Sequence, residues 1–193
     1  MPGLFLFSSN SLTDAPLWNY TISVNEQYGK VISIIARGTN SGKTYLMERL
    51  ITELKSRGRK VTAVKHAMHG HAVDPEGKDT YKFAQRGADR VILFTPDGLL
   101  MYEKAHPDTD YLYTMASRDM DIVLVEGFKS GPFRKIEVFN EENYDTPLCV
   151  EKPDQHFLAI VSRAPVDTDI PQFRFEDIGA IAAFIERSTC SQR

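Results

Sequence analysis

The stretch IIARGTNSGKTYLMERL, residues 34–50, decides the fold because a glycine-containing loop joins an apolar run to an amphipathic helix. Its core, Ser-Gly-Lys-Thr at residues 41–44, is typical of loops whose backbone N–H groups cradle phosphate. Such loops usually begin with a glycine where this chain has Arg37, and Gly38 comes one position later. The alternative is a chance turn, but a strand directly before the loop and a helix directly after it favour a phosphate site.

Each residue type in this loop has an expected task. Gly42 lets the backbone approach phosphate closely. Lys43 is expected to reach the β- and γ-phosphates, and the Thr44 hydroxyl to bind Mg²⁺. The predicted nucleotide-binding residues are Gly38, Thr39, Asn40, Ser41, Gly42, Lys43, Thr44 and Tyr45.

A second strand supplies an acidic residue. Residues 122–125 are apolar without alternation, which is typical of a strand buried on both faces of a parallel sheet. Glu126 follows directly, and open α/β sheets place ligands at the carboxyl ends of their strands. We therefore expect Thr44 and Glu126 to lie near Mg²⁺, although a solvated residue at a strand end is the alternative for Glu126.

Apolar runs alternate with helical patterns along most of the chain, which predicts an open α/β sheet with right-handed crossovers. The fold class is α/β, with three layers and a mostly parallel central sheet. Residues 29–193 are expected to form one nucleotide-binding domain, and residues 1–28 an extension, either native with a possible edge strand at 19–24 or left from expression. Residues 141–156 are the longest expected loop. Strands are predicted at 30–36, 59–67, 90–96, 121–128, 134–140 and 157–163, and helices at 43–58, 79–88, 107–120 and 175–188.

Composition excludes several classes of protein. The net charge of −3 over 193 residues gives no basic field for nucleic acid. Two cysteines are too few for a disulfide framework. No apolar run reaches the ~18 residues of a membrane span. These features lead us to expect a cytoplasmic protein that binds neither nucleic acid nor membrane.

Five motifs follow one another in a fixed order: NSGKT (40–44), VKHAMHGH (64–71), PEGKDTYKFAQRGAD (75–89), LVEGFK (124–129) and KIEVF (135–139). In this order they resemble the MobB-like family, the GTP-binding adaptors of molybdopterin guanine dinucleotide biosynthesis. The resemblance runs from about Lys30 to Glu186. The phosphate loop alone is common to many families, whereas the combination of motifs is much more specific.

This resemblance implies a P-loop NTPase fold, a homodimer, and binding of GTP with Mg²⁺ and weak hydrolysis. It also implies partnership with the guanylyltransferase that joins GMP to molybdopterin. By position in the family's motif, Asp79 would be a switch-like residue near the metal or the attacking water; alternatively, Asp79 is only a helix N-cap. Arg163 stands where the family often has an acid, which leaves the choice between GTP and ATP open.

The remaining candidates are basic residues after the second predicted strand. Contact with substrate or partner is expected from Lys65, His66, His69, His71 and Lys78. A polar, flexible loop is the alternative. The same loop keeps open a metal-delivery GTPase that carries Ni²⁺ or Zn²⁺ on His69 and His71. A small-molecule kinase would need an arginine-rich lid, which the sequence lacks. Arg37 keeps open a degenerate P-loop scaffold that binds no nucleotide.

Overall fold

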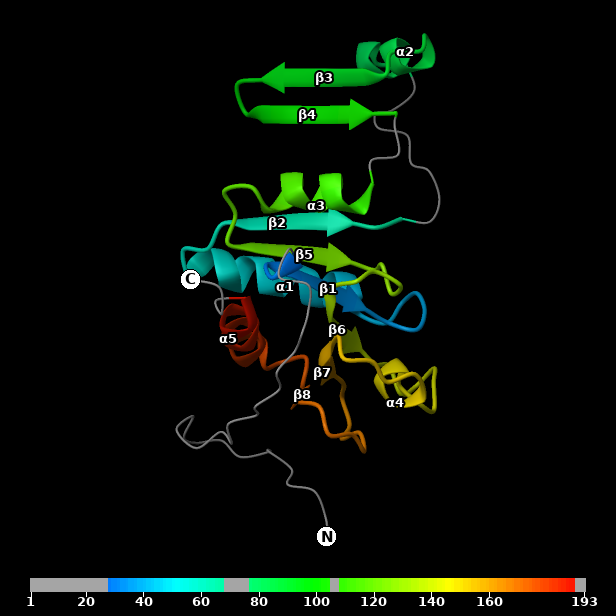
Figure 1. Ribbon diagram of the computed structural model, residues 1–193, viewed down its shortest axis with the longest axis vertical. Helices are drawn as coiled ribbons and strands as arrows, with labels where there is room; N and C mark the ends of the chain where they lie inside the picture. The colour runs from blue at the N-terminus through cyan, green and yellow to red at the C-terminus, as the bar shows by residue number, and fades with distance from the viewer. Residues whose placement is uncertain (1–27, 68–76, 105–107, 190–193) are drawn as a thin grey trace.

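Six parallel strands form the central sheet of this protein, in the order β2-β5-β1-β6-β7-β8 (Figure 1). The structure is a computed structural model that describes residues 28–67, 77–104 and 108–189. The expected edge strand at 19–24 therefore lies outside the described residues. The strands are β1 (Val31–Ile35), β2 (Val61–Lys65), β5 (Ile122–Glu126), β6 (Arg134–Val138), β7 (Phe157–Val161) and β8 (Gln172–Phe173).

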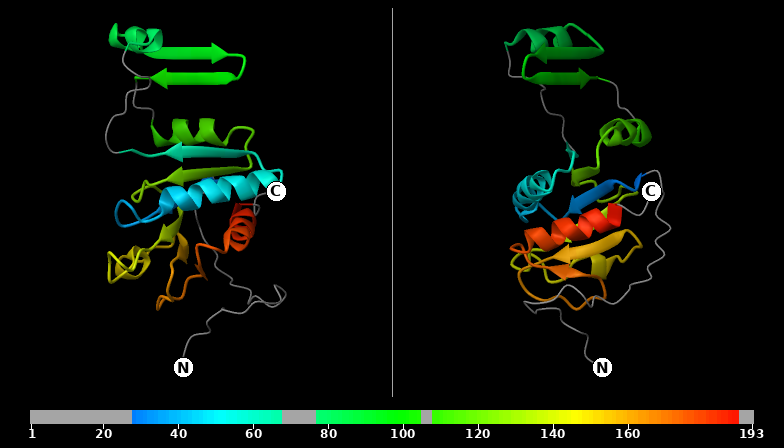
Figure 2. Two further views of the ribbon diagram at one scale, coloured as in Figure 1. Left: turned by 180° about the vertical axis from the view of Figure 1, so that it is seen from behind. Right: turned by 90° about the vertical axis from the view of Figure 1, so that its left-hand side faces the viewer.

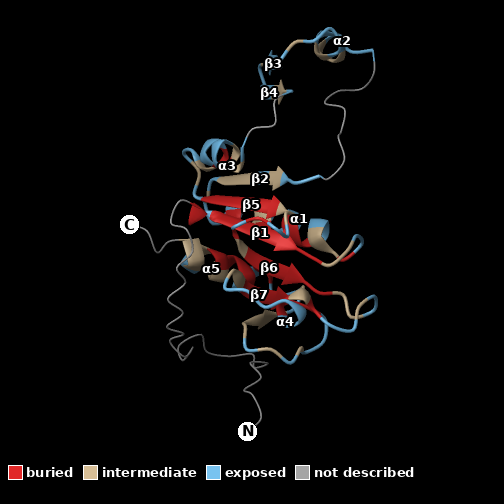
Figure 3. Cartoon of the chain, turned by 45° about the vertical axis from the view of Figure 1, so that its right-hand side comes forward, coloured by how far each residue is buried: buried red, intermediate tan, exposed pale blue. Residues whose placement is uncertain are grey.

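Helices cover both faces of this sheet, which gives the three expected layers (Figure 2). Helices α1 (Lys43–Ser56) and α5 (Ile178–Thr189) pack on one face, where Ile32 and Ile34 of β1 point. Helix α3 (Thr109–Ser117) packs on the other face, where Val31 points. Because both faces are covered, β5 and β7 are nearly continuous apolar runs, and Figure 3 shows β1 and β5 buried along most of their length.

The helix after the phosphate loop is held by its apolar face. Leu46, Leu50 and Leu54 of α1 are all 0% exposed, as their helical spacing predicted. A short helix, α4 (Leu148–Glu151), interrupts the long loop expected at 141–156. None of the helices in the described ranges is long and apolar enough to cross a membrane.

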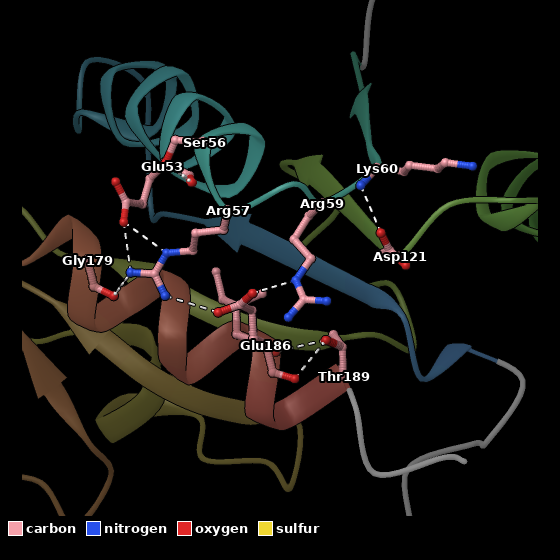
Figure 4. Close-up of polar contacts among 10 residues, drawn as sticks. Glu53, Ser56, Arg57, Arg59, Lys60, Asp121, Gly179, Glu186 and Thr189 are labelled. Atoms are coloured by element: carbon pink, nitrogen blue, oxygen red, sulfur yellow. Dashed lines mark hydrogen bonds and ion pairs between the residues drawn. The ribbon is translucent and has the colours of Figure 1, made fainter.

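An ion-pair cluster fixes the far end of α1 against α5 (Figure 4). Arg57 donates to Glu53 and to the carbonyl of Gly179, and both Arg57 and Arg59 pair with Glu186. Burial opposes ionisation of Glu186, but hydrogen bonds from the two arginines outweigh it and lower its pKa below the ordinary value. Glu186 therefore stays charged, and the cluster holds the helix that carries the phosphate loop at its other end.

The predicted strand at 90–96 is confirmed, but it does not join the central sheet. It forms β3 (Arg90–Thr95), which pairs antiparallel with β4 (Gly98–Glu103), a strand that the sequence analysis missed. Pro96 and Asp97 make the two-residue turn between them, and proline there ended the predicted strand without revealing the hairpin. This hairpin and α2 (Asp79–Gln85) stand clear of the central sheet in Figure 1.

Candidate nucleotide-binding site

The predicted phosphate loop connects the centre of the sheet to the start of α1. Strand β1 ends at Ile35 between β5 and β6, and Gly42 is the N-cap of α1 with a φ of 89°. A Cβ on Gly42 would lie 2.9 Å from Cε1 of Phe175, so glycine is required by both the backbone and the space. The first N–H groups of α1 thus open onto the loop, as anion sites at helix N-termini require.

Lys43 lies across this loop. Its Nζ donates to the carbonyl of Gly38 at 2.7 Å and to Oγ of Ser41 at 3.0 Å. Burial lowers the pKa of Lys43, the carboxylate of Glu126 opposes that shift, and the positive charge of Lys129 adds to it. The ammonium group is therefore partly desolvated at the position where phosphate oxygens bind in such loops.

Thr44 and Glu126 meet, as their places at adjacent strand ends predicted. The Thr44 hydroxyl donates to Oε1 of Glu126 at 3.1 Å, and β5 is the direct neighbour of β1 in the sheet. A hydroxyl and a carboxylate are the hard oxygen ligands that Mg²⁺ takes beside phosphate oxygens and water. The donor set at this point therefore fits Mg²⁺.

Arg37 turns its side chain away from the loop that it opens. Its guanidinium ion-pairs with Glu151 of α4 and donates to the carbonyl of Thr146 at 3.0 Å. It also lies over the ring of Tyr144, with 5.5 Å between the guanidinium carbon and the ring centroid. Arg37 thus ties the loop to the segment before α4 instead of filling the phosphate position.

The remaining predicted loop residues differ in backbone conformation and exposure. Asn40 adopts a left-handed conformation with a φ of 55°, while Ser41 is buried and Thr39 is exposed. Tyr45 is 52% exposed and accepts a hydrogen bond from Arg49 at 3.0 Å.

Two residues near the loop were not among the predicted site residues. The hydroxyl of Tyr144 lies so close to Gly38 that a Cβ there would come within 2.2 Å of it. Lys129 donates from Nζ to the carbonyl of Arg37 at 2.9 Å. The sequence carried no signal for Tyr144. Lys129 could have been considered as a site residue, because it comes only three positions after Glu126.

The other predicted residues are spread over two parts of the structure. Lys65 is exposed at the end of β2, in register with Glu126, and the His66 ring stacks on Phe128 with centroids 4.3 Å apart. Lys78 is the N-cap of α2 and Asp79 its first residue, paired with Lys82 at 3.1 Å. Asp79 is therefore not the N-cap that the sequence analysis considered.

The structure does not place Lys78 and Asp79 in contact with the phosphate loop, because α2 belongs to the unit that stands clear of the sheet (Figure 1). His69 and His71 lie outside the described residues. Within the described ranges there is no group of three or more histidine, cysteine, aspartate or glutamate side chains that could hold a metal ion.

Acidic residues after β6 contact the segment after β7. The Oε1 atom of Glu141 accepts a hydrogen bond from the Ala164 backbone N–H at 2.8 Å, while its Oε2 atom is buried and has no hydrogen-bond partner among the described residues. The neighbouring Glu142 forms an exposed ion pair with Arg163 at 2.5 Å. A buried carboxylate oxygen without a partner is costly, and such an atom calls for an explanation.

Comparison with known proteins matches most of this chain to one protein family. The family model described as "Molybdopterin guanine dinucleotide synthesis protein B" (MobB) matches residues 31–163. The molybdopterin-guanine dinucleotide biosynthesis adapter protein of Haemophilus influenzae is 38% identical over 151 residues, which are 77% of this chain and 83% of that protein. The corresponding Escherichia coli protein is 32% identical over 157 residues, covering 78% and 88% of the two chains.

Solved structures agree with these matches. The crystal structure of molybdopterin-guanine biosynthesis protein B superimposes with a TM-score of 0.62 at 31% identity, covering 80% of this chain and 95% of that one. Bacillus subtilis MobB superimposes with a TM-score of 0.67 over 84% of this chain and 99% of its own, and at 23% identity it supports the fold alone.

Proposed function

Because this chain belongs to the molybdopterin guanine dinucleotide synthesis protein B family, we propose that it is an adapter in the synthesis of that dinucleotide and that GTP with Mg²⁺ is its ligand. In this role it assists the guanylyltransferase that joins GMP to molybdopterin, and the bound nucleotide sets the conformation that this partner recognises.

The observation that carries the nucleotide part is the meeting of Lys43, Thr44 and Glu126 at the carboxyl edge of β1 and β5. Lys43 spans the loop to Gly38, and Thr44 lies 3.1 Å from Glu126. A cation for phosphate and an oxygen pair for Mg²⁺ are thus adjacent, which is the arrangement that phosphoryl ligands need. Arg37 faces Glu151 and leaves this arrangement unobstructed, so it no longer favours a scaffold without nucleotide.

The preference for GTP is supported by Glu141. Guanine presents two adjacent N–H donors on one edge, whereas adenine presents an acceptor at the corresponding ring nitrogen. Within the part of the chain that the structure describes, the Oε2 atom of Glu141 has no hydrogen-bond partner, and its segment follows β6 at the sheet edge where α/β folds bind ligands. A carboxylate at this point would accept hydrogen bonds from guanine and repel adenine. The test of this function is titration of GTP and ATP, each with Mg²⁺, into the protein.

The hairpin of β3 and β4 supports a homodimer. One of its faces carries Ile92, Phe94 and Leu99, which are 53%, 80% and 63% exposed. A hairpin of two strands is marginally stable alone, and an exposed apolar face of this kind marks an interaction site. The hairpin stands clear of the sheet of its own chain (Figure 1), so a second copy of this chain is the occupant that we propose.

Replacing Phe94 with aspartate should therefore convert the dimer to a monomer, because a carboxylate would be buried against apolar side chains. Sedimentation velocity at several concentrations measures this change. Val150→Asp is the matched control, since Val150 is also an exposed apolar residue, at 41%, but lies on α4. A wild-type protein that sediments as a monomer at all concentrations, or a Phe94→Asp variant that stays dimeric, would refute this interface.

A further inference from the structure

The turn that follows β5 has an unusual backbone. Gly127 and Phe128 have φ values of 92° and 60°, so two successive residues are left-handed, and the second of them is not glycine. Left-handed bulky residues are rare, persist only where the surroundings enforce them, and cluster at ligand-binding sites. This strained turn lies directly after the magnesium-site candidate Glu126.

Aromatic packing holds Phe128 in this conformation. Its ring stacks on His66 with centroids 4.3 Å apart and meets Phe133 edge to face at 5.6 Å. A Cβ on Gly131 would lie 2.9 Å from Cδ1 of Phe128, so the end of the turn also closes tightly on this ring. The path of the chain after Glu126 is therefore fixed by contacts and is not that of a free surface loop.

The turn brings Lys129 to the phosphate loop. Its Nζ lies 2.9 Å from the carbonyl of Arg37, and Nζ of Lys43 lies 2.7 Å from the carbonyl of the next residue, Gly38. Consecutive carbonyl groups thus each hold a lysine ammonium group. The two ammonium groups repel each other, and the nearby carboxylate of Glu126 offsets part of this repulsion at Lys43. An anion bound beside both lysines would offset more of it than the neutral carbonyls do.

We propose that Lys129 binds the terminal phosphate of the nucleotide. This inference rests on the proposed nucleotide-binding function. A triphosphate bound to Mg²⁺ retains more negative charge than Lys43 alone can neutralise, and Lys129 supplies the second positive charge. A diphosphate lacks the group that Lys129 contacts. Lys129 therefore distinguishes the triphosphate state from the diphosphate state.

The test is calorimetric titration of two ligands, each in the presence of Mg²⁺, into wild type and into the Lys129→Met variant. One ligand is a non-hydrolysable GTP analogue, and the other is GDP. The Lys129→Met variant should bind the analogue about ten-fold more weakly than wild type, because it loses a hydrogen bond to the charged terminal phosphate. Its affinity for GDP should be almost unchanged, because GDP has no terminal phosphate for Lys129 to contact. Lys129→Arg should restore most of the preference for the GTP analogue over GDP. Lys60→Met is the matched control, because Lys60 is an exposed lysine directly before β2, at the amino end of that strand, whereas Lys129 follows the carboxyl end of β5.

The outcomes separate this inference from the function on which it rests. If wild type binds neither ligand, the proposed nucleotide binding is wrong and the role of Lys129 falls with it. If wild type binds both ligands and Lys129→Met keeps the same ratio of affinities, only the role of Lys129 is refuted. An equal loss of affinity for both ligands also refutes contact with the terminal phosphate.

Discussion

Lys43→Ala should weaken GTP binding by at least about 100-fold, because two or more charge-assisted hydrogen bonds to phosphate are lost. In the structure the Lys43 ammonium group spans the loop to the Gly38 carbonyl at 2.7 Å, partly removed from water. Lys129 does not make up for this loss, because its own proposed contact with the terminal phosphate is present in both wild type and variant. Titration calorimetry with Mg²⁺ and GTP measures the loss.

The matched control for this variant is Lys55→Ala. Lys55 lies on the same helix but in its last turn, where its side chain is exposed. It should leave GTP affinity within about two-fold of wild type, because a surface charge so distant is screened by salt. Circular dichroism checks that both variants are folded. Unchanged GTP affinity in a folded Lys43→Ala variant would place the nucleotide elsewhere.

Glu141→Gln should reduce the preference for GTP over ATP by about 10- to 100-fold, the range expected for hydrogen bonds to a charged group. The amide oxygen can still accept the Ala164 N–H that Glu141 now binds at 2.8 Å. Its NH₂ group would then face the base, where it opposes the N–H donors of guanine and suits the acceptor nitrogen of adenine. Titration of both nucleotides into both proteins gives the ratio of affinities.

Glu142→Gln is the control for the Glu141 variant. Glu142 is the next residue, but its carboxylate is exposed and pairs with Arg163, so its loss should change both affinities little. A GTP preference that survives in Glu141→Gln, or that disappears only in Glu142→Gln, would show that another group recognises the base.

The sequence predicted the features of this fold that depend on neighbouring residues. A short β-branched run predicted β1, and an apolar run without alternation predicted β5. Helical spacing predicted the buried face of α1, and Ser-Gly-Lys-Thr predicted the loop that joins β1 to α1. The meeting of Thr44 with Glu126 was also predictable, because the carboxyl ends of neighbouring parallel strands share one edge of the sheet.

Contacts between distant residues could not be predicted in this way. Arg37 looked like a defect because only the chain around it was considered, whereas its ion-pair partner Glu151 is separated from it by 114 positions. The hairpin was missed because Pro96 was interpreted only as the end of a strand, although Pro-Asp-Gly at residues 96–98, between two apolar runs, is itself a turn signal. The contact between Glu141 and Ala164 joins the ends of two strands and has no local pattern.

The central claim is that this chain binds GTP with Mg²⁺ at the loop of Gly38 to Thr44. Calorimetric titration of GTP and of ATP, each with Mg²⁺, into the wild-type protein tests it most directly. We predict saturable GTP binding at one site per chain, with ATP bound more weakly. The absence of binding by either nucleotide would contradict the claim and would leave an adapter whose P-loop is structural.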